Sequence, residues 1–335
     1  MKNIKDMNIA LLLGGTSPER EVSKSSGKAI YHELKNLGYK VKLIDPAYGI
    51  NQPENEEDYF IPGRDYAEIS NRNCIAVINS GLFDDVDIAF LGLHGKWSED
   101  GTLQGLLELR GIKYTGSGVL ASSLAMDKSM SKIMFQHYDV VTPEWFVAGK
   151  DDADLMLIKE KITKLLSYPC IIKPNDQGST IGLTKCSSED EVEEAVKLAL
   201  QFSDKAVIEE FIPGHEITVA VLEGHALPVL EIKPGHGFYD YECKYTSGMS
   251  EYIVPAELPD SVVKRLQSQA MLAFNSLGCS VYGRVDFRIT GDYKIYCLEV
   301  NTLPGMTGTS LVPKMAKAEG ISFGRLLEKI IQLSI

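Results

Sequence analysis

The chain has 335 residues, of which 44% are hydrophobic, and it carries a formal net charge of −12. This length is sufficient for two or three domains with their own cores, and the acidic balance argues against a nucleic-acid-binding surface. The six cysteines show no CxxC spacing and no apolar run approaches membrane length, so we expect a cytoplasmic protein with reduced thiols and no membrane contact.

The first block of the chain predicts a βαβ unit. Residues 8–15, "NIALLLGG", read as a buried strand that ends in a glycine turn, residues 23–40 as a helix, and residues 41–45 as a second strand. This order is typical of a parallel sheet. Residues 52–73 are polar and irregular, and we interpret them as a surface insertion. A strand that runs into a glycine loop (86–95) and a helix with a glycine stop (102–111) follow.

The character of the sequence changes near residue 117. A helix is predicted at 127–139, two strands around a Gly/Ser/Thr-rich loop at 168–186, and an amphipathic helix at 189–202. The last third alternates strands and helices around a long aromatic and polar loop, residues 234–258, which is typical of an active-site cover. We therefore predict three domains, with boundaries at 1–116, 117–209 and 210–335.

Two neighbouring strands predict a metal site. Asp286 lies in "GRVDFRI", while Glu299 and Asn301 lie two residues apart in "YKIYCLEVN" and so share one face of their strand. The short connection between the two segments makes them antiparallel neighbours. Oxygen-bearing side chains on one such face suit Mg²⁺, with phosphates as further ligands. The alternative is that each is an ordinary solvated strand residue.

Two further segments have a weaker signal. Lys173 follows an apolar strand and precedes a loop in which backbone N–H groups near Gly178 can cradle phosphate, although the segment is no Walker A loop and a flexible hairpin is the alternative. His94 and Glu99 follow a buried strand, where ligands bind in open α/β sheets. The absence of HExxH and GxSxG argues against zinc and serine hydrolases.

The first glycine turn excludes another class. The segment "LLLGGTSPEREVS" lacks the GxGxxG spacing of a nicotinamide-binding strand. Glu19 lies in this turn, where the next helix begins. It is interpreted either as a helix-start carboxylate or as an anchor for a substrate ammonium group.

Ordered motifs along almost the whole chain resemble one family. These are "LLLGGTSPEREVSKSSG", "HGKWSEDGTLQG", "MDKSMSK", "KPNDQGSTIG", "FYDYECKY", "GRVDF" and "NTLPGMTGTSLVP". Together they resemble the D-alanine–D-alanine ligases of the ATP-grasp superfamily. The resemblance implies an α/β and α+β fold of three domains, the first of them Rossmann-like, with ATP held between the sheets of the last two. It also implies that ATP phosphorylates one D-alanine, and that the amine of a second D-alanine attacks the acyl phosphate.

The resemblance also implies roles for residues around the first substrate. Glu19 would bind its ammonium group, and Ser179 and Tyr245 would join Glu19 in a hydrogen-bonded triad that holds the lid closed. His94, supported by Glu99, would lie beside the same substrate.

Other roles concern charge that develops during the reaction. Arg284 and the backbone N–H of Gly305 would stabilise the tetrahedral oxyanion, and Ser310 would receive the carboxylate of the second substrate. The residues implied to contact phosphates are Lys128, Lys173 and Lys244, the last of these grouped with the substrate-binding residues.

The resemblance finally implies residues that contact the nucleotide and its metal ions. Glu209 would contact adenine and Glu216 ribose, while Asp286, Glu299 and Asn301 would hold two Mg²⁺, with Mn²⁺ as an alternative. The expected partners are ATP and D-alanine, and the family implies a homodimer.

The chain departs from the family pattern where Ser98 follows Trp97, at a position that is usually Gly. A left-handed backbone there would cost Ser about 1 kcal/mol. Two alternatives remain: the same chemistry with D-serine, D-lactate or another amino acid as acceptor, and a non-catalytic ATP-binding regulator. The complete set of lysines and metal ligands argues against the regulator.

Overall fold

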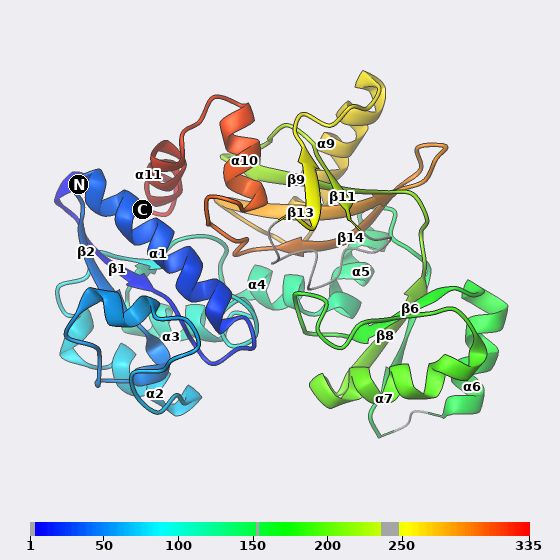
Figure 1. Cartoon of the computed structure of the whole chain (residues 1–335), viewed down its shortest axis with the longest axis horizontal. Helices are drawn as coiled ribbons and strands as arrows, with labels where there is room; N and C mark the ends of the chain where they lie inside the picture. The colour runs from blue at the N-terminus through cyan, green and yellow to red at the C-terminus, as the bar shows by residue number, and fades with distance from the viewer. Residues whose placement is uncertain (1–3, 152–153, 236–247) are drawn as a thin grey trace.

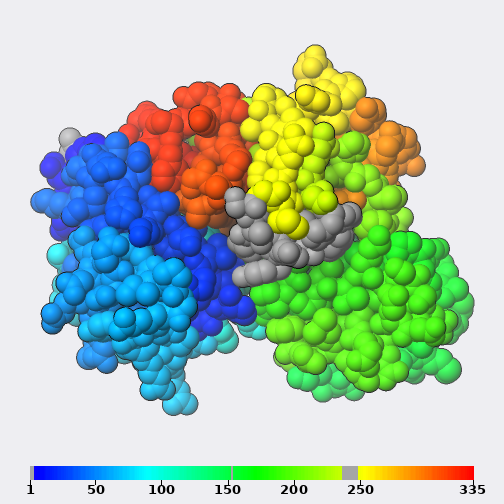
Figure 2. Space-filling model, in the orientation of Figure 1, coloured from blue at the N-terminus to red at the C-terminus, as the bar shows by residue number. Residues whose placement is uncertain are grey.

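The structure, a computed structural model, describes residues 4–151, 154–235 and 248–335. Three β-sheets organise these residues, each in its own lobe (Figures 1 and 2). Figure 2 shows the blue-to-cyan N-terminal lobe at the left, the green central lobe at the lower right and the C-terminal lobe, mostly yellow to red, along the top. Lys244 and Tyr245, for which the sequence predicts roles in the site, lie outside the described residues.

The N-terminal lobe contains a parallel sheet in the order β2-β1-β3-β4. Residues 9–12 are apolar and fully buried, as expected for a central parallel strand that is covered on both faces. The strands and helices of this lobe are β1 (Asn8–Leu12), α1 (Arg20–Asn36), β2 (Lys40–Ile44), α2 (Asn71–Ile78), β3 (Ile88–Leu91), α3 (Thr102–Arg110) and β4 (Lys113–Tyr114).

Two helices, α4 (Val119–Met126) and α5 (Lys128–His137), follow β4 and pack beside the C-terminal sheet. The central lobe then forms an antiparallel sheet in the order β5-β8-β6-β7. Its elements are β5 (Trp145–Gly149), α6 (Leu155–Lys161), β6 (Cys170–Pro174), β7 (Thr184–Cys186), α7 (Val192–Phe202) and β8 (Lys205–Glu210). Helix α7 buries Val192, Ala195, Val196 and Ala199, the spacing of one helical face.

The C-terminal sheet has the order β12-β11-β9-β13-β14 in the described residues, and β10 pairs with β9. Its strands are β9 (His215–Leu222), β10 (His225–Ala226), β11 (Leu230–Pro234), β12 (Ser250–Ile253), β13 (Tyr282–Ile289) and β14 (Ile295–Asn301). Its helices are α9 (Asp260–Ser276), α10 (Leu311–Ala318) and α11 (Phe323–Leu333).

The cores show which lobes are packed together. One apolar core combines the N-terminal sheet with α10, α11 and residues of the C-terminal sheet, such as Leu222 and Tyr282. The central lobe has a separate core, which includes Ile158, Ile172 and Val196. The N-terminal and C-terminal lobes are therefore joined by apolar packing, while the central lobe packs around its own centre.

The structure corrects the interpretation of residues 52–73 as surface decoration. This segment contains a short 3-10 helix (Glu56–Phe60), and Tyr59 and Phe60 are buried in the core of the N-terminal lobe. Asp65 forms an ion pair with Arg20 (2.7 Å) at the start of α1. Most of the other residues in the segment are polar, so its composition does not reveal that these two aromatic side chains are buried.

The structure also tests several elements that were predicted from the sequence. The predicted strands at 282–289 and 293–301 are confirmed as antiparallel neighbours, the second of them beginning at Ile295, and Glu19 is confirmed as the residue that precedes α1. Helix α10 begins within the motif "NTLPGMTGTSLVP", and β12 lies within the predicted long loop. The domain boundaries after residues 116 and 209 stay a prediction. Within the described residues, no helix is long and apolar enough to span a bilayer.

Candidate active site

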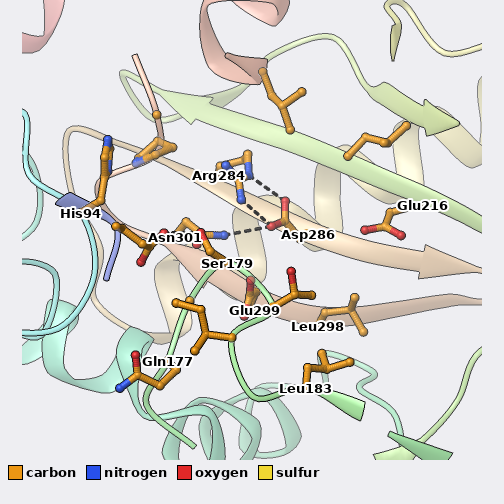
Figure 3. A pocket seen from close by; sticks show the side chains of 18 of the residues that line it. His94, Gln177, Ser179, Leu183, Glu216, Arg284, Asp286, Leu298, Glu299 and Asn301 are labelled. Carbon is orange, nitrogen blue, oxygen red and sulfur yellow. Dashed lines mark hydrogen bonds and ion pairs between the residues drawn. The ribbon is translucent and has the colours of Figure 1, made fainter. Parts of the chain in front are cut away.

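A cavity of about 640 Å³ opens where the three lobes meet. Its lining includes Glu19 and His94 from the N-terminal lobe, Lys173 from β6, and the polar ends of β13 and β14 (Figure 3). Figure 3 shows His94, Arg284, Asp286, Glu299 and Asn301 around a shared space, on different elements. A concave site with convergent charged groups is the usual form of a small-molecule site.

Strands β13 and β14 form a polar floor for this cavity. Asp286 pairs in register with Glu299, and Arg284 pairs with Asn301, so the four side chains share one face of the sheet. The register shifts after Asp286, which makes Leu298 an extra residue on β14. This bulge is a local irregularity next to the site, where bulges commonly re-aim side chains.

Asp286 is held by three side chains in the structure. The Arg284 guanidinium donates two hydrogen bonds to its two carboxylate oxygens (2.8 and 2.7 Å), and Asn301 Nδ2 donates one (2.9 Å). Thr218 Oγ1 on β9 donates another (2.7 Å). The carboxylate is therefore fixed on the floor before any ligand enters, which is the preorganisation that a catalytic site needs.

Lys128 links α5 to this floor. Its ammonium group lies 3.0 Å from Glu299 Oε2 and donates to the Gln177 carbonyl (2.8 Å). Burial lowers the pKa of Lys128, but the Glu299 carboxylate outweighs that effect, so the pKa is raised. Asp127, the N-cap of α5, accepts from the backbone N–H of Met130 and fixes the start of the helix. Lys128 therefore stays cationic at the cavity wall.

A buried cluster of three charges supports the wall formed by the central lobe. Glu209 on β8 forms ion pairs with Lys132 (2.9 Å, Oε2) and, at its other oxygen, with Lys173. Lys132 is fully buried and also donates to Thr142 Oγ1 (2.6 Å). Burial alone would raise the pKa of Glu209, but the two ammonium groups hold it at about 2. Two lysines and one carboxylate leave a net positive charge beside the cavity, which suits an anionic ligand.

Glu216 lies farther along the same cavity, on β9. Arg288 NH1 on β13 lies 3.1 Å from Glu216 Oε2, and the same guanidinium donates to the carbonyls of Ile212 and Gly214 (3.0 Å each). These bonds fix the carboxylate against the connection between β8 and β9. Arg288 therefore holds Glu216 at the wall of the cavity.

The end of the cavity at the N-terminal lobe is formed by α1 and the loop after β3. Ser179 Oγ donates a hydrogen bond to Glu19, across the boundary with the central lobe. His94 is buried, with Nδ1 bonded to the Leu303 carbonyl and Nε2 to Ser26 Oγ (2.9 Å each). Burial lowers the pKa of His94, but Glu99, 3.8 Å from Nδ1, and Glu19 outweigh it and raise the pKa.

The glycine turn after β1 explains why Glu19 can reach the cavity. Gly14 has φ +81°, and a Cβ there would lie 2.1 Å from Asp45 Oδ2. Only glycine fits such a turn, because any other residue would collide with that carboxylate and adopt a strained backbone. The chain reverses tightly at this point, and α1 begins at Arg20 with Glu19 facing the cavity.

The loop that contains Ser98 does not show the strain expected from the sequence. The left-handed residue is Trp97, with φ 71°, while Ser98 lies outside the positive-φ region and is buried. The position that is usually Gly in the family therefore does not need glycine in this chain. The residue with the strained backbone is Trp97, which precedes Ser98.

Replacement of Trp97 tests this assignment. We expect Trp97→Gly to be more stable than Trp97→Ala by about 1 kcal/mol, since both changes remove the ring but only glycine accepts φ 71° without strain. The free energy of unfolding in urea is the measurement. A Trp97→Ala protein at least as stable as Trp97→Gly would contradict the left-handed backbone at this residue.

The segment after β14 supplies the remaining predicted residues. Ser310 precedes α10, and its hydroxyl accepts from the Thr307 backbone N–H (2.9 Å) and bonds Thr307 Oγ1 (2.7 Å). A Cβ at Gly305 would lie 2.9 Å from Ser310 Oγ, so the backbone approaches that hydroxyl closely. Both residues line the cavity at the positive end of the α10 dipole, where a carboxylate is favoured.

Three side chains on the floor of the cavity offer oxygen ligands for a metal. Asp286 and Glu299 offer carboxylates and Asn301 an amide oxygen, all hard oxygen ligands. No group of three or more His, Cys, Asp and Glu side chains suited to a metal occurs in residues 4–151, 154–235 and 248–335. The set therefore fits a cation that takes part of its coordination from phosphate or water, as Mg²⁺ does.

Sequence reasoning missed two residues that support the site, Lys132 and Arg288. Lys132 lies on an amphipathic helix, where a lysine is ordinarily solvated. Arg288 occurs two residues after Asp286 on the same strand, so the period of two already placed it on the polar face. That spacing was the available signal for Arg288, while only the packed structure reveals Lys132.

Facing walls of lysines and carboxylates between two antiparallel sheets, beside a Rossmann-like lobe, define an ATP-grasp ligase. The sequence model described as D-ala D-ala ligase N-terminus matches residues 8–117, and that described as D-ala D-ala ligase C-terminus matches residues 134–332. The chain belongs to the D-alanine–D-alanine ligase family.

Relatives agree over nearly the whole chain. The chain is 43% identical to D-alanine--D-alanine ligase from Syntrophotalea carbinolica (98% of this chain, 97% of that protein) and 42% identical to that from Halalkalibacterium halodurans (98% and 99%). The structure resembles the D-alanine--D-alanine ligase from Bacillus anthracis complexed with ATP (TM-score 0.78, 33% identity, 98% and 97% coverage). It also resembles the VanG D-Ala:D-Ser ligase from Enterococcus faecalis (0.79, 29%, 98% and 100%).

Proposed function

We propose that this ATP-dependent D-alanine–D-alanine ligase joins its two substrates in the cavity described above, with the residues predicted from the sequence in the predicted roles. The observation that carries the proposal is the convergence of three unlike surfaces on one space. These are the positively charged wall at Lys128 and Lys173, the oxygen-rich floor at Asp286 and Glu299, and the carboxylate of Glu19 at the far end. They suit phosphate, metal and a substrate ammonium group respectively.

ATP would lie between the central and C-terminal sheets. Lys128 and Lys173 would contact its phosphates, Glu209 the adenine and Glu216 the ribose. The net positive charge of the cluster formed by Lys132, Lys173 and Glu209 supports this placement. The fixed orientation of Glu216, held by Arg288, supports the ribose contact.

Asp286, Glu299 and Asn301 would hold two Mg²⁺, and Mn²⁺ offers the same charge and ligand preference. Bound to the phosphates, these ions would neutralise charge as the phosphoryl group transfers. The chain itself fixes the floor before binding, because Asp286 is already held by Arg284, Asn301 and Thr218.

The first D-alanine would bind with its ammonium group at Glu19, beside His94 and Glu99. Its carboxylate oxygen would attack the terminal phosphorus of ATP and give an acyl phosphate and ADP. The position of His94 at the cavity wall, 3.8 Å from Glu99, supports its place beside this substrate. The Ser179–Glu19 hydrogen bond would close the end of the cavity and restrict water.

The second D-alanine would place its carboxylate at Ser310, at the start of α10. Its amine would attack the acyl carbon, and phosphate would leave with the oxygen that joined it to that carbon. Arg284 and the Gly305 backbone N–H would stabilise the negative oxygen of the tetrahedral intermediate. The acceptor position is the least constrained by the described residues, because Lys244 and Tyr245 lie outside them.

ADP release by the purified protein tests the proposed function. We expect turnover with ATP, Mg²⁺ and D-alanine alone, a product with the mass of the dipeptide, and little turnover with L-alanine. Additions of D-serine or D-lactate measure the acceptor preference. ADP release that requires an acceptor other than D-alanine would contradict D-alanine as second substrate, and no ADP release under any condition would contradict the ligase.

We also propose a homodimer in the cytoplasm that supplies dipeptide for peptidoglycan precursors. Leu109 on α3 and Leu120 on α4 are 89% and 72% exposed, and the two helices are in contact. Exposed leucines on adjoining helices suit a subunit interface. Sedimentation analysis of the protein and of Leu109→Glu/Leu120→Glu tests this, since the paired charges should shift a dimer toward monomer. An unchanged dimer would place the interface elsewhere.

A further inference from the structure

Among the residues that the structure describes, a hydrogen bond and an ion pair connect the N-terminal lobe to the loop between β6 and β7, residues 175–183, which we name the Ser179 loop. The first is the hydrogen bond from Ser179 to Glu19, which the proposed function already uses. The second is an ion pair between Lys96 Nζ and Asp176 Oδ2, at 2.7 Å. Lys96 follows His94 in its loop, so the ion pair connects the two segments that border the first-substrate site.

These contacts cross between bodies that are packed separately. The Ser179 loop belongs to the central lobe, whose apolar core is distinct from the core that joins the N-terminal and C-terminal lobes. Polar contacts at the cavity mouth therefore help to set the position of the loop relative to Glu19. Gly178 lies against Glu19, because a Cβ there would come within 2.8 Å of Oε2.

The backbone of the loop is strained where it meets Glu19. Ser179 has φ 50° and Thr180 has φ 61°, both in the left-handed region. Two successive non-glycine residues in this region persist only where surrounding contacts hold them. The loop is bonded to its own lobe through the Gln177 amide, which donates to Phe202 O (3.1 Å), and to α5 through the Gln177 carbonyl, which accepts from Lys128. The Lys96 contact ties the loop to the N-terminal lobe, three residues before Ser179.

The carboxylate of Asp176 depends on Lys96. The side chains of Lys96 and Asp176 are 32% and 28% exposed, so water screens the pair only in part. Asp176 Oδ1 is buried and accepts no hydrogen bond from any residue that the structure describes. Removal of Lys96 would leave this carboxylate partly buried without its counter-ion, which is more costly than loss of an exposed pair.

We propose that Lys96 and Asp176 are positioning residues, and that their ion pair holds the Ser179 loop closed over the first-substrate site. Through the loop, the pair keeps Ser179 in hydrogen-bond contact with Glu19 and limits the entry of water while the acyl phosphate exists. This part of the inference rests on the proposed function. Neither residue contacts the reacting atoms; each acts through the loop.

Charge-reversal variants of Lys96 and Asp176 test the ion pair, because combining the two reversals restores a pair of opposite charges. Lys96→Asp and Asp176→Lys each create two like charges at the contact, and the double variant restores an opposite pair with its direction reversed. For each single variant we expect the ratio of ADP to dipeptide and the KM of D-alanine to rise roughly fivefold or more, since the coupling of partly buried charges exceeds that of exposed pairs. The double variant should return within about twofold of wild type.

Amide hydrogen exchange of residues 175–183 without substrates provides a readout that does not depend on catalysis. Exchange in the loop should accelerate in both single variants and recover in the double variant, while exchange in β6 and β8 stays at the wild-type rate. Lys150→Asp and Asp204→Lys are the matched controls, because that pair is exposed and lies within the central lobe. These controls should change neither the product ratio nor the loop exchange.

The outcomes separate this inference from the proposed function. If wild type makes no dipeptide, the ligase proposal fails, while exchange in the loop still tests the ion pair. If wild type makes dipeptide but single reversals leave the product ratio and loop exchange unchanged, the positioning role is wrong. A double variant that stays as impaired as the single variants would likewise overturn it, because the effect would then not arise from pairing.

Discussion

Glu299→Gln lowers the rate of ADP formation by roughly 10²–10³-fold, the usual cost of removing a group that stabilises developing charge. Glu299 lies on the cavity floor opposite Asp286 and pairs with Lys128 (3.0 Å). Glutamine keeps the size and polarity of the side chain but removes the charge that a metal and Lys128 both require. Initial rates of ADP release at saturating ATP and D-alanine measure the effect.

The control for this change is Asp292→Asn, which removes a carboxylate from the exposed turn between the same two strands. It should retain the wild-type rate. A titration with Mg²⁺ adds a second readout, since loss of a metal ligand raises the concentration needed for half-maximal activity. If Glu299→Gln retained a tenth or more of the wild-type rate, the assignment of Glu299 as a metal ligand would be wrong.

Glu209→Gln destabilises the protein by about 3–5 kcal/mol, the range for breaking a buried ion pair from one side. The change leaves the ammonium groups of Lys132 and Lys173 facing each other in the interior without the carboxylate between them. The free energy of unfolding in urea is the measurement. Combining the change with Lys132→Met removes one of the stranded charges, so the double variant should be more stable than Glu209→Gln alone. A loss below 1 kcal/mol would contradict the three-charge cluster.

The same cluster predicts a pH dependence with a definite sign. The pKa of Glu209 is lowered from 4.5 to about 2 in the folded protein, because Lys132 and Lys173 outweigh the effect of burial. A depressed carboxyl pKa contributes stability that is fully present above pH 4.5 and is lost as pH falls toward 2. The difference in unfolding free energy between wild type and Glu209→Gln should therefore shrink over that interval. A difference that stayed constant would show that Glu209 keeps its ordinary pKa.

Much of the fold followed from local patterns in the sequence. The first βαβ unit has a buried apolar strand, a glycine turn and a helix with a glycine stop, and each signal depends only on near neighbours. The polar floor of the cavity was predictable for the same reason. A period of two placed Glu299 and Asn301 on one face, and a short connection made Asp286 their neighbour.

What the sequence did not reveal depends on long-range packing. Lys132 looks like a surface lysine until β8 brings Glu209 beside it. The Lys96–Asp176 contact joins residues 80 positions apart from separately packed lobes. The anchors Tyr59 and Phe60 are concealed in a polar stretch. In each case the partner is set by tertiary structure, which composition and periodicity do not encode.

The measurement that tests the central claim most directly uses D-alanine with ¹⁸O in both carboxyl oxygens, together with ATP, Mg²⁺ and the wild-type protein. Ligation through an acyl phosphate transfers one carboxyl oxygen of the first D-alanine to phosphate for each dipeptide formed. We predict one ¹⁸O per phosphate released, with phosphate, ADP and dipeptide in equal amounts. Dipeptide formed with unlabelled phosphate would contradict the acyl-phosphate route, and labelled phosphate without dipeptide would contradict D-alanine as the acceptor.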